Sequence, residues 1–65
     1  MPRYFFHVHV GDKTERDTTG LELPGLTEAI AAAQRARLEI MTEDELDQLW
    51  LEIMDETGTI VARIT

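Results

Sequence analysis

The sequence predicts an α+β domain in which a single antiparallel sheet of three to four strands carries one helix on one of its faces. Two kinds of periodicity lead to this prediction. Hydrophobic residues alternate with a period of two over residues 3–10 and 49–64, which is typical of strands, and repeat with a period near 3.6 over residues 26–41, which is typical of a helix. Because no linker or internal repeat divides the chain, we expect residues 1–65 to form one domain.

The first strand is expected over Arg3–Val10, where inward and outward side chains alternate. Gly11, Asp12 and Lys13 are the residue types of a tight turn. Thr14–Asp17 then predicts a short, weak return strand, so that the two segments form a hairpin. The number of strands depends on whether this second arm pairs.

The helix is expected to begin just after Pro24, because the residue that precedes a proline is pushed towards extended geometry. Gly25 and Thr27 compete as the N-cap, and the alanines that follow favour a helix intrinsically. The hydrophobic stripe loses its phase near residues 41–43, where the helix should end. Thr42–Glu45 has the spacing of a capping box and predicts one short extra turn.

Two further strands are expected over Leu49–Met54 and Thr59–Ile64, and the turn Asp55–Gly58 joins them into a hairpin. The predicted order is therefore strand, weak strand, helix, strand, strand. The helix should cover the sheet face that is formed by Tyr4, Phe6, Val8, Leu51, Ile53, Ile60 and Ile64.

The opposite face of the predicted sheet is more apolar than a face in contact with water usually is. By the same alternation, it carries Phe5, His7, His9, Trp50, Glu52, Met54, Val61 and Arg63. We predict an interface, most simply with a second copy of the chain in a homodimer, that is formed by Phe5, Trp50, Met54 and Val61. The alternative is that strand propensity alone selects aromatic and branched residues on an open face, where long polar side chains cover them.

The composition narrows the classes of function. The chain has 13 acidic and 6 basic residues and a net charge of −7, which disfavours nucleic acid as a partner because basic patches are needed to neutralise phosphates. It has no cysteine, which excludes disulfides and thiolate chemistry. No apolar run is long enough to span a membrane, so we expect a soluble, cytoplasmic protein without a membrane partner.

His7 and His9 are the candidate metal ligands. Their side chains share one face of a strand and lie about 7 Å apart along it, so that both imidazoles could reach one ion. A third ligand would have to be an acid, either Glu52 across the sheet or Asp12 or Asp17 near the turn. The alternative is that both histidines are surface residues of an ordinary strand, and we expect no physiological metal or cofactor.

We do not expect an enzyme. The chain has no serine or cysteine, and its threonines fall in turns, caps or strand ends without an adjacent base. Its 4 glycines are isolated and do not form a phosphate-binding loop. The expected role is therefore that of a small interaction module.

Three stretches resemble a family of small bacterial proteins that is known only as a domain of unknown function. They are the strand start MPRYFFHVHVGD, the turn and helix start RDTTGLELPGLTEAIAAA, and the hairpin LWLEIMDETGTIV, and they occur in this order over nearly the whole chain. This resemblance implies no activity, cofactor or catalytic residue.

A shorter stretch, LPGLTEAIAAAQ, is similar to the N-terminal domain of HicB-like antitoxins, in which a strand hairpin leads through a turn into an alanine-rich helix. This second resemblance implies a small acidic protein that caps a basic toxin. It therefore offers a protein partner as an alternative to self-association.

Overall fold

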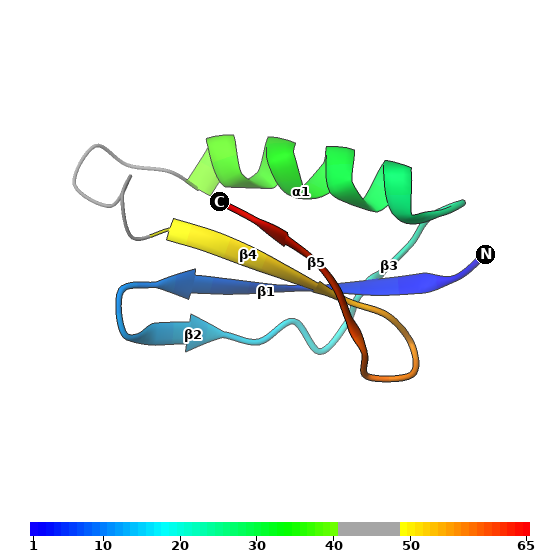
Figure 1. Ribbon diagram of the computed structural model, residues 1–65, viewed down its shortest axis with the longest axis horizontal. Coiled ribbons are helices and arrows are strands. Elements are labelled where there is room, and N and C mark those ends of the chain that lie inside the picture. Colours follow the sequence, from blue (N-terminus) through cyan, green and yellow to red (C-terminus); the bar gives the residue numbers. More distant parts are fainter. Residues whose placement is uncertain (41–48) are drawn as a thin grey trace.

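A helix lies across one face of an antiparallel sheet in the computed structural model, which describes residues 1–40 and 49–65 (Figure 1). The predicted α+β class is confirmed, and the described residues form a sheet of five strands. In chain order, the elements are β1 (Arg3–Val10), β2 (Lys13–Glu15), β3 (Leu21–Glu22), α1 (Leu26–Ile40), β4 (Leu49–Met54) and β5 (Ile60–Ile64). The strand order is β2-β1-β4-β5, and β3 also pairs with β1.

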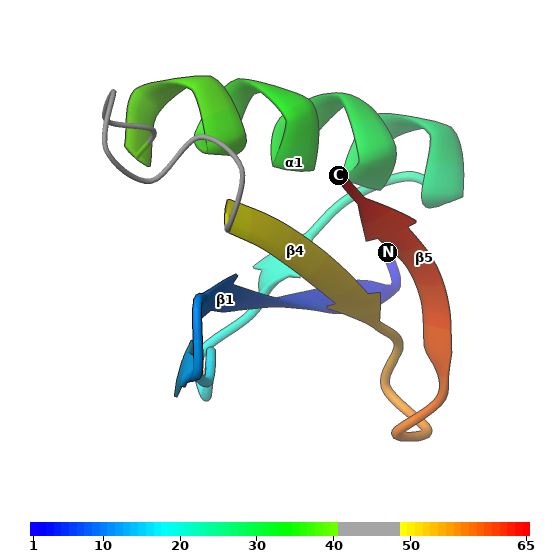
Figure 2. The same cartoon turned by 60° about the vertical axis from the view of Figure 1, so that its left-hand side comes forward.

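The helix α1 contacts β4 and β5, whereas β1 lies farther from it (Figure 2). Ala29 and Ala33 are fully buried where the helix meets the sheet. Because each alanine presents only a methyl group, the helix backbone can approach the strands closely. The alanine-rich stretch therefore serves both helix propensity and close packing.

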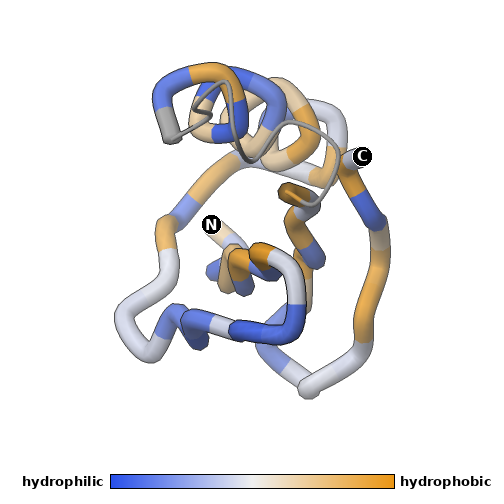
Figure 3. The backbone as a smooth tube through the Cα atoms, turned by 90° about the vertical axis from the view of Figure 1, so that its left-hand side faces the viewer, coloured by the Kyte–Doolittle hydropathy of each residue, from blue (hydrophilic) through white to orange (hydrophobic). Residues whose placement is uncertain are grey.

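β2 and β3 pair with the same edge of β1, but at opposite ends of it. β2 pairs with the last three residues of β1, and β3 pairs with Arg3 and Tyr4. The hydrophilic chain around β2 lies on the side of the molecule away from α1 (Figure 3). The predicted three to four strands were thus too few, because the two-residue β3 is too short to show a period, and the predicted return strand Thr14–Asp17 is found at Lys13–Glu15.

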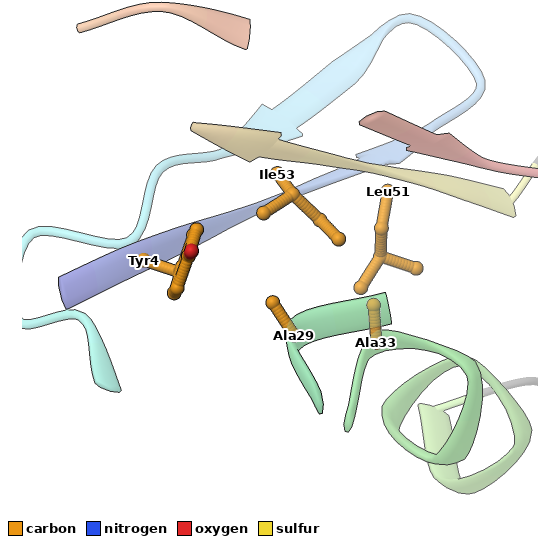
Figure 4. Close-up of a cluster of buried hydrophobic side chains, with 5 residues drawn as sticks. All are labelled: Tyr4, Ala29, Ala33, Leu51 and Ile53. Carbon is orange, nitrogen blue, oxygen red and sulfur yellow. The ribbon is translucent and has the colours of Figure 1, made fainter. Parts of the chain in front are cut away.

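The core is small and lies between α1 and the central strands. Tyr4, Leu51 and Ile53 point from the sheet towards Ala29 and Ala33 of the helix (Figure 4). Leu51 and Ile53 are the largest side chains that are fully buried, and each stabilises the fold by about 2 kcal/mol. The predicted inward set is confirmed for these three sheet residues.

A bulge at the start of β5 reverses two predicted orientations. Ile53 pairs with Ala62, but the next residue, Met54, pairs with Ile60, so that Val61 is the extra residue. Val61 packs against the core cluster, and Ile60 is 41% exposed. The predictions that Ile60 faces the helix and Val61 faces away from it were therefore wrong, because one inserted residue shifts the alternation.

The helix is confirmed from its predicted start to Ile40. Its predicted end near residues 41–43 and the predicted turn at Thr42–Glu45 lie outside the described residues. In the ranges that are described, no helix has the length and apolar character to cross a membrane.

Candidate functional site

The sheet face away from α1, which we call the open face, carries the candidate residues. Strand register arranges them in rows that run across the sheet. The rows are Phe5–Met54–Ile60, His7–Glu52–Arg63 and His9–Trp50. The face thus has an apolar row at one end and polar and aromatic side chains at the other.

Trp50 is contacted by two side chains of its own chain. The His9 ring stacks on it, with the ring centroids 4.0 Å apart and the planes 10° from parallel. The guanidinium carbon of Arg63 lies 5.6 Å from the Trp50 ring, within the range of a cation–π interaction. Part of the apolar surface that the sequence assigned to an interface is therefore covered within the monomer.

The His9 imidazole connects a hydroxyl group to a carboxylate. Its Nε2 lies 2.6 Å from Oε1 of Glu52, and its Nδ1 lies 3.0 Å from Oγ1 of Thr14. The other Glu52 oxygen is 3.9 Å from Nε of Arg63. The prediction that the threonines lack an adjacent base is wrong for Thr14, because β2 places it directly opposite His9.

In many enzymes, a hydroxyl, an imidazole and a carboxylate are hydrogen-bonded in this order. The imidazole then acts as the base that activates the hydroxyl as a nucleophile, and the carboxylate orients the imidazole. Catalysis would also need a substrate cavity and donors aimed at the developing charge. An apolar cavity of about 210 Å³ does exist, but it lies on the helix-facing side of the sheet. It is lined by Phe6, Val8, Leu21, Ala32, Ala36 and Leu51.

His7 is buried rather than displayed. Its side chain is on the open face, yet the residue is only 5% exposed. Its Nδ1 accepts a hydrogen bond of 3.1 Å from the backbone N–H of Asp17, and its Nε2 has no hydrogen-bond partner among the described residues. The chain that follows β2 therefore covers His7, a contact that strand alternation cannot reveal.

The Asp17 carboxylate lies at the edge of β1, between the segments of this edge that pair with β2 and β3. Its Oδ2 accepts a hydrogen bond from the backbone N–H of Phe6, and its Oδ1 accepts one each from Thr19 and Gly20. Burial by itself would raise the pKa of Asp17, but the three backbone hydrogen bonds, together with the attraction of a protonated His7, lower it. The sequence did contain a signal for this role, since an aspartate two residues before Thr-Gly is typical of a side-chain-capped turn.

The metal-site prediction gains little from this geometry. His9 and Glu52 do come together, but Nδ1 of His7 already accepts a hydrogen bond from the backbone N–H of Asp17. Within residues 1–40 and 49–65, no group of three or more histidines and acids is arranged to hold an ion.

Three of the four residues of the predicted interface lie on the open face, and the fourth does not. Phe5, Trp50 and Met54 lie on the open face, as predicted, and all three are half-buried. Val61 does not lie there, because the bulge turns it towards the core, and Ile60 takes its place opposite Met54. We call the row Phe5–Met54–Ile60 the apolar row.

Comparisons with known proteins place the chain in a family. Neither a search of curated proteins nor a search of solved structures found a match. A family model described as "Domain of unknown function (DUF6894)" matches residues 3–65, which is nearly the whole chain. The chain therefore belongs to the DUF6894 family.

Proposed function

We propose that this domain is a small acidic interaction module, without catalytic activity, that self-associates through its open face. The observation that carries the proposal is the apolar row, which crosses β1, β4 and β5 in register. Its member Ile60 is among the exposed large hydrophobic side chains. Contiguous apolar groups on a rigid sheet are typical of a protein interface.

A second copy of the chain suits this face because a two-fold axis sets the same row against itself. The stacked and charged side chains of His9, Glu52 and Arg63 would then form a polar rim beside the apolar row. Each copy carries a net charge of −7, so two copies repel each other and salt should favour association.

Sedimentation equilibrium at about 10 to 100 μM, where weak interfaces are populated, tests this proposal. We expect the wild-type chain to be dimeric and Ile60→Glu to be monomeric, because the new carboxylate would be buried in the interface. Leu38→Glu is the matched control, since Leu38 is 66% exposed and lies on α1.

The control variant should remain dimeric. A wild-type monomer at the highest concentration, or equal loss of dimer in both variants, would contradict the proposal. Trp50→Ala should also weaken the dimer, because Trp50 lies on the same open face of β4, one row beyond Glu52.

A second candidate is a domain that caps a basic protein partner. The net charge of −7 favours it, because opposite charge accelerates and orients association. In that case the chain alone would be monomeric, and a pull-down from the native host would recover a small basic protein whose binding falls steeply with salt.

A further inference from the structure

We propose that His7 is a proton-operated latch that holds the backbone of Asp17 against β1 only while its imidazole is neutral. The relevant segment, residues 16–20, is called the Asp17 loop below. The inference does not depend on the proposed self-association, because it concerns contacts within one chain.

The hydrogen bond itself defines the protonation state. The N–H of Asp17 donates to Nδ1 of His7 over 3.1 Å. An imidazole nitrogen can accept only when it carries no proton, so His7 is neutral and has its proton on Nε2. If Nδ1 also carried a proton, the Nδ1–H group of His7 and the N–H group of Asp17 would point at each other, and neither could accept a hydrogen bond.

Burial makes this conflict hard to avoid. His7 is 5% exposed, and the Nε2 proton already lacks a partner among the described residues. A charged imidazolium at this place would have two N–H groups in need of acceptors and less water around it than it needs. Relief requires the Asp17 N–H to move away.

The neighbouring acids attract a protonated His7, but they do not remove the clash between its Nδ1 proton and the Asp17 N–H. Two carboxylates lie near His7: that of Asp17, and that of Glu52 directly across on β4. The first already accepts three backbone N–H groups, and the second is engaged by His9 and Arg63. The titratable and charged groups on the elements around His7 are Arg16 and Asp17 of the loop, His9 of β1, Glu52 of β4 and Arg63 of β5.

Other contacts restrict what opens. The Arg3 side chain donates to the carbonyl of Thr19 over 2.8 Å and pairs with Glu22, and neither contact involves His7. Protonation should therefore free the centre of the Asp17 loop while its far end stays tied. The freed centre would loosen the cover of the β1 edge between β2 and β3, where the backbone N–H of Phe6 donates to the Asp17 carboxylate.

Amide hydrogen exchange on the full ¹⁵N-labelled chain tests the latch. After correction for intrinsic exchange, we expect the protection of the Asp17 amide to fall at least about tenfold between pH 7.5 and pH 5, the range in which histidines titrate. The Gly20 amide, which donates to the Asp17 carboxylate, should change much less. Long-range ¹H–¹⁵N spectra should show the Nε2–H form of His7 at high pH.

Two variants separate His7 from the other titrating groups. His7→Asn places a carboxamide oxygen near the position of Nδ1, so it can accept the same N–H without titrating, and protection of Asp17 should become independent of pH. His9→Asn should keep the wild-type response. If His7→Asn does not fold, the tautomer and the titration of His7 in the wild-type chain decide alone.

Three outcomes would overturn the latch. The first is an Nδ1–H tautomer of His7 at high pH. The second is a pH-dependent loss of Asp17 amide protection that persists in His7→Asn or vanishes in His9→Asn. The third is a loss of protection that begins only below about pH 4, where carboxylates titrate.

Discussion

Gly20 is held by both its backbone angle and its neighbours. Its φ of +74° lies in the left-handed region, which side chains with a Cβ disfavour. A Cβ built there would lie 2.8 Å from Cγ of Arg3 and 3.0 Å from the Phe5 ring. Gly58 also has a positive φ, of +87°, but a Cβ there would meet nothing within 4 Å. An added Cβ would therefore cause backbone strain at both glycines, but steric crowding only at Gly20.

We expect Gly20→Ala to destabilise the chain more than Gly58→Ala. The Gly58 variant should cost about 1 kcal/mol for backbone strain alone. The Gly20 variant should cost about 2 kcal/mol or more, because Arg3 must also give up its position at the Thr19 carbonyl. Urea unfolding of both variants measures the difference, and equal losses would mean that crowding at Gly20 is relieved without cost.

At the scale of single residues, the sequence predicted which side chains share a face but not what they do there. Alternation along β1 correctly put Phe5, His7 and His9 together. The stacking of His9 and the burial of His7 depend on side-chain rotamers and on the path of the Asp17 loop. The alternation of residues along a strand indicates neither the rotamers nor the path. The helical and strand periods are stronger signals because many residues contribute to each.

Among the elements, the hairpin of β4 and β5 has a turn that is held together by a side-chain carboxylate. Oδ1 of Asp55 accepts hydrogen bonds from the Thr57 hydroxyl and from the backbone N–H groups of Thr57 and Thr59. The bond from the Thr57 side chain is the main reason why the pKa of Asp55 is lowered, the Thr59 backbone adds to it, and partial desolvation opposes both. A carboxylate thus fixes the turn that sets the register of β5.

Asp55→Asn should therefore destabilise the hairpin in a pH-dependent way. A lowered pKa in the folded state means that ionised Asp55 stabilises the fold above its ordinary pKa near 3.8, and that this contribution is lost as the pH falls through the lower folded value. The urea midpoint of the variant should lie below that of the wild type at neutral pH, and the two should converge as the pH falls through the lowered folded pKa of Asp55. A constant difference across this range would show that the charge is not responsible.

The same hairpin shows why some elements escaped prediction. The sequence placed β4 and the turn correctly, since alternation and a turn motif both mark them. Nothing in the sequence pattern indicates the bulge at Val61, because isoleucine and valine are both apolar and either can face the core. Likewise, β3 owes its existence to pairing with Arg3 and Tyr4 and not to a pattern of its own.

For the whole molecule, the dominant electrostatic feature is the net charge of −7 on 65 residues. The ion pairs of the described residues are few, and Arg3–Glu22 is largely exposed and worth little. The repulsion among the excess acidic side chains should therefore outweigh the attraction within the ion pairs. Compact states lose stability when like charges accumulate.

We expect the melting temperature to rise between about 10 and 200 mM NaCl, because salt screens this repulsion over the distances that separate surface charges. Glu15→Gln and Glu39→Gln, at exposed positions, should each reduce the rise. Scanning calorimetry at a fixed protein concentration gives the measurement. A fall in melting temperature with salt would show that the ion pairs of Arg3 and Glu52 outweigh the repulsion.

The pairing of β1 with β4 has a consequence for how the chain acquires its fold. His9 and Glu52, which meet on these neighbouring strands, are 43 positions apart in the sequence. The central strands must therefore close a long loop before their contacts stabilise anything, and such non-local closure slows folding. During synthesis, β1 and its buried Tyr4 therefore lack their partner strand until β4 has been made.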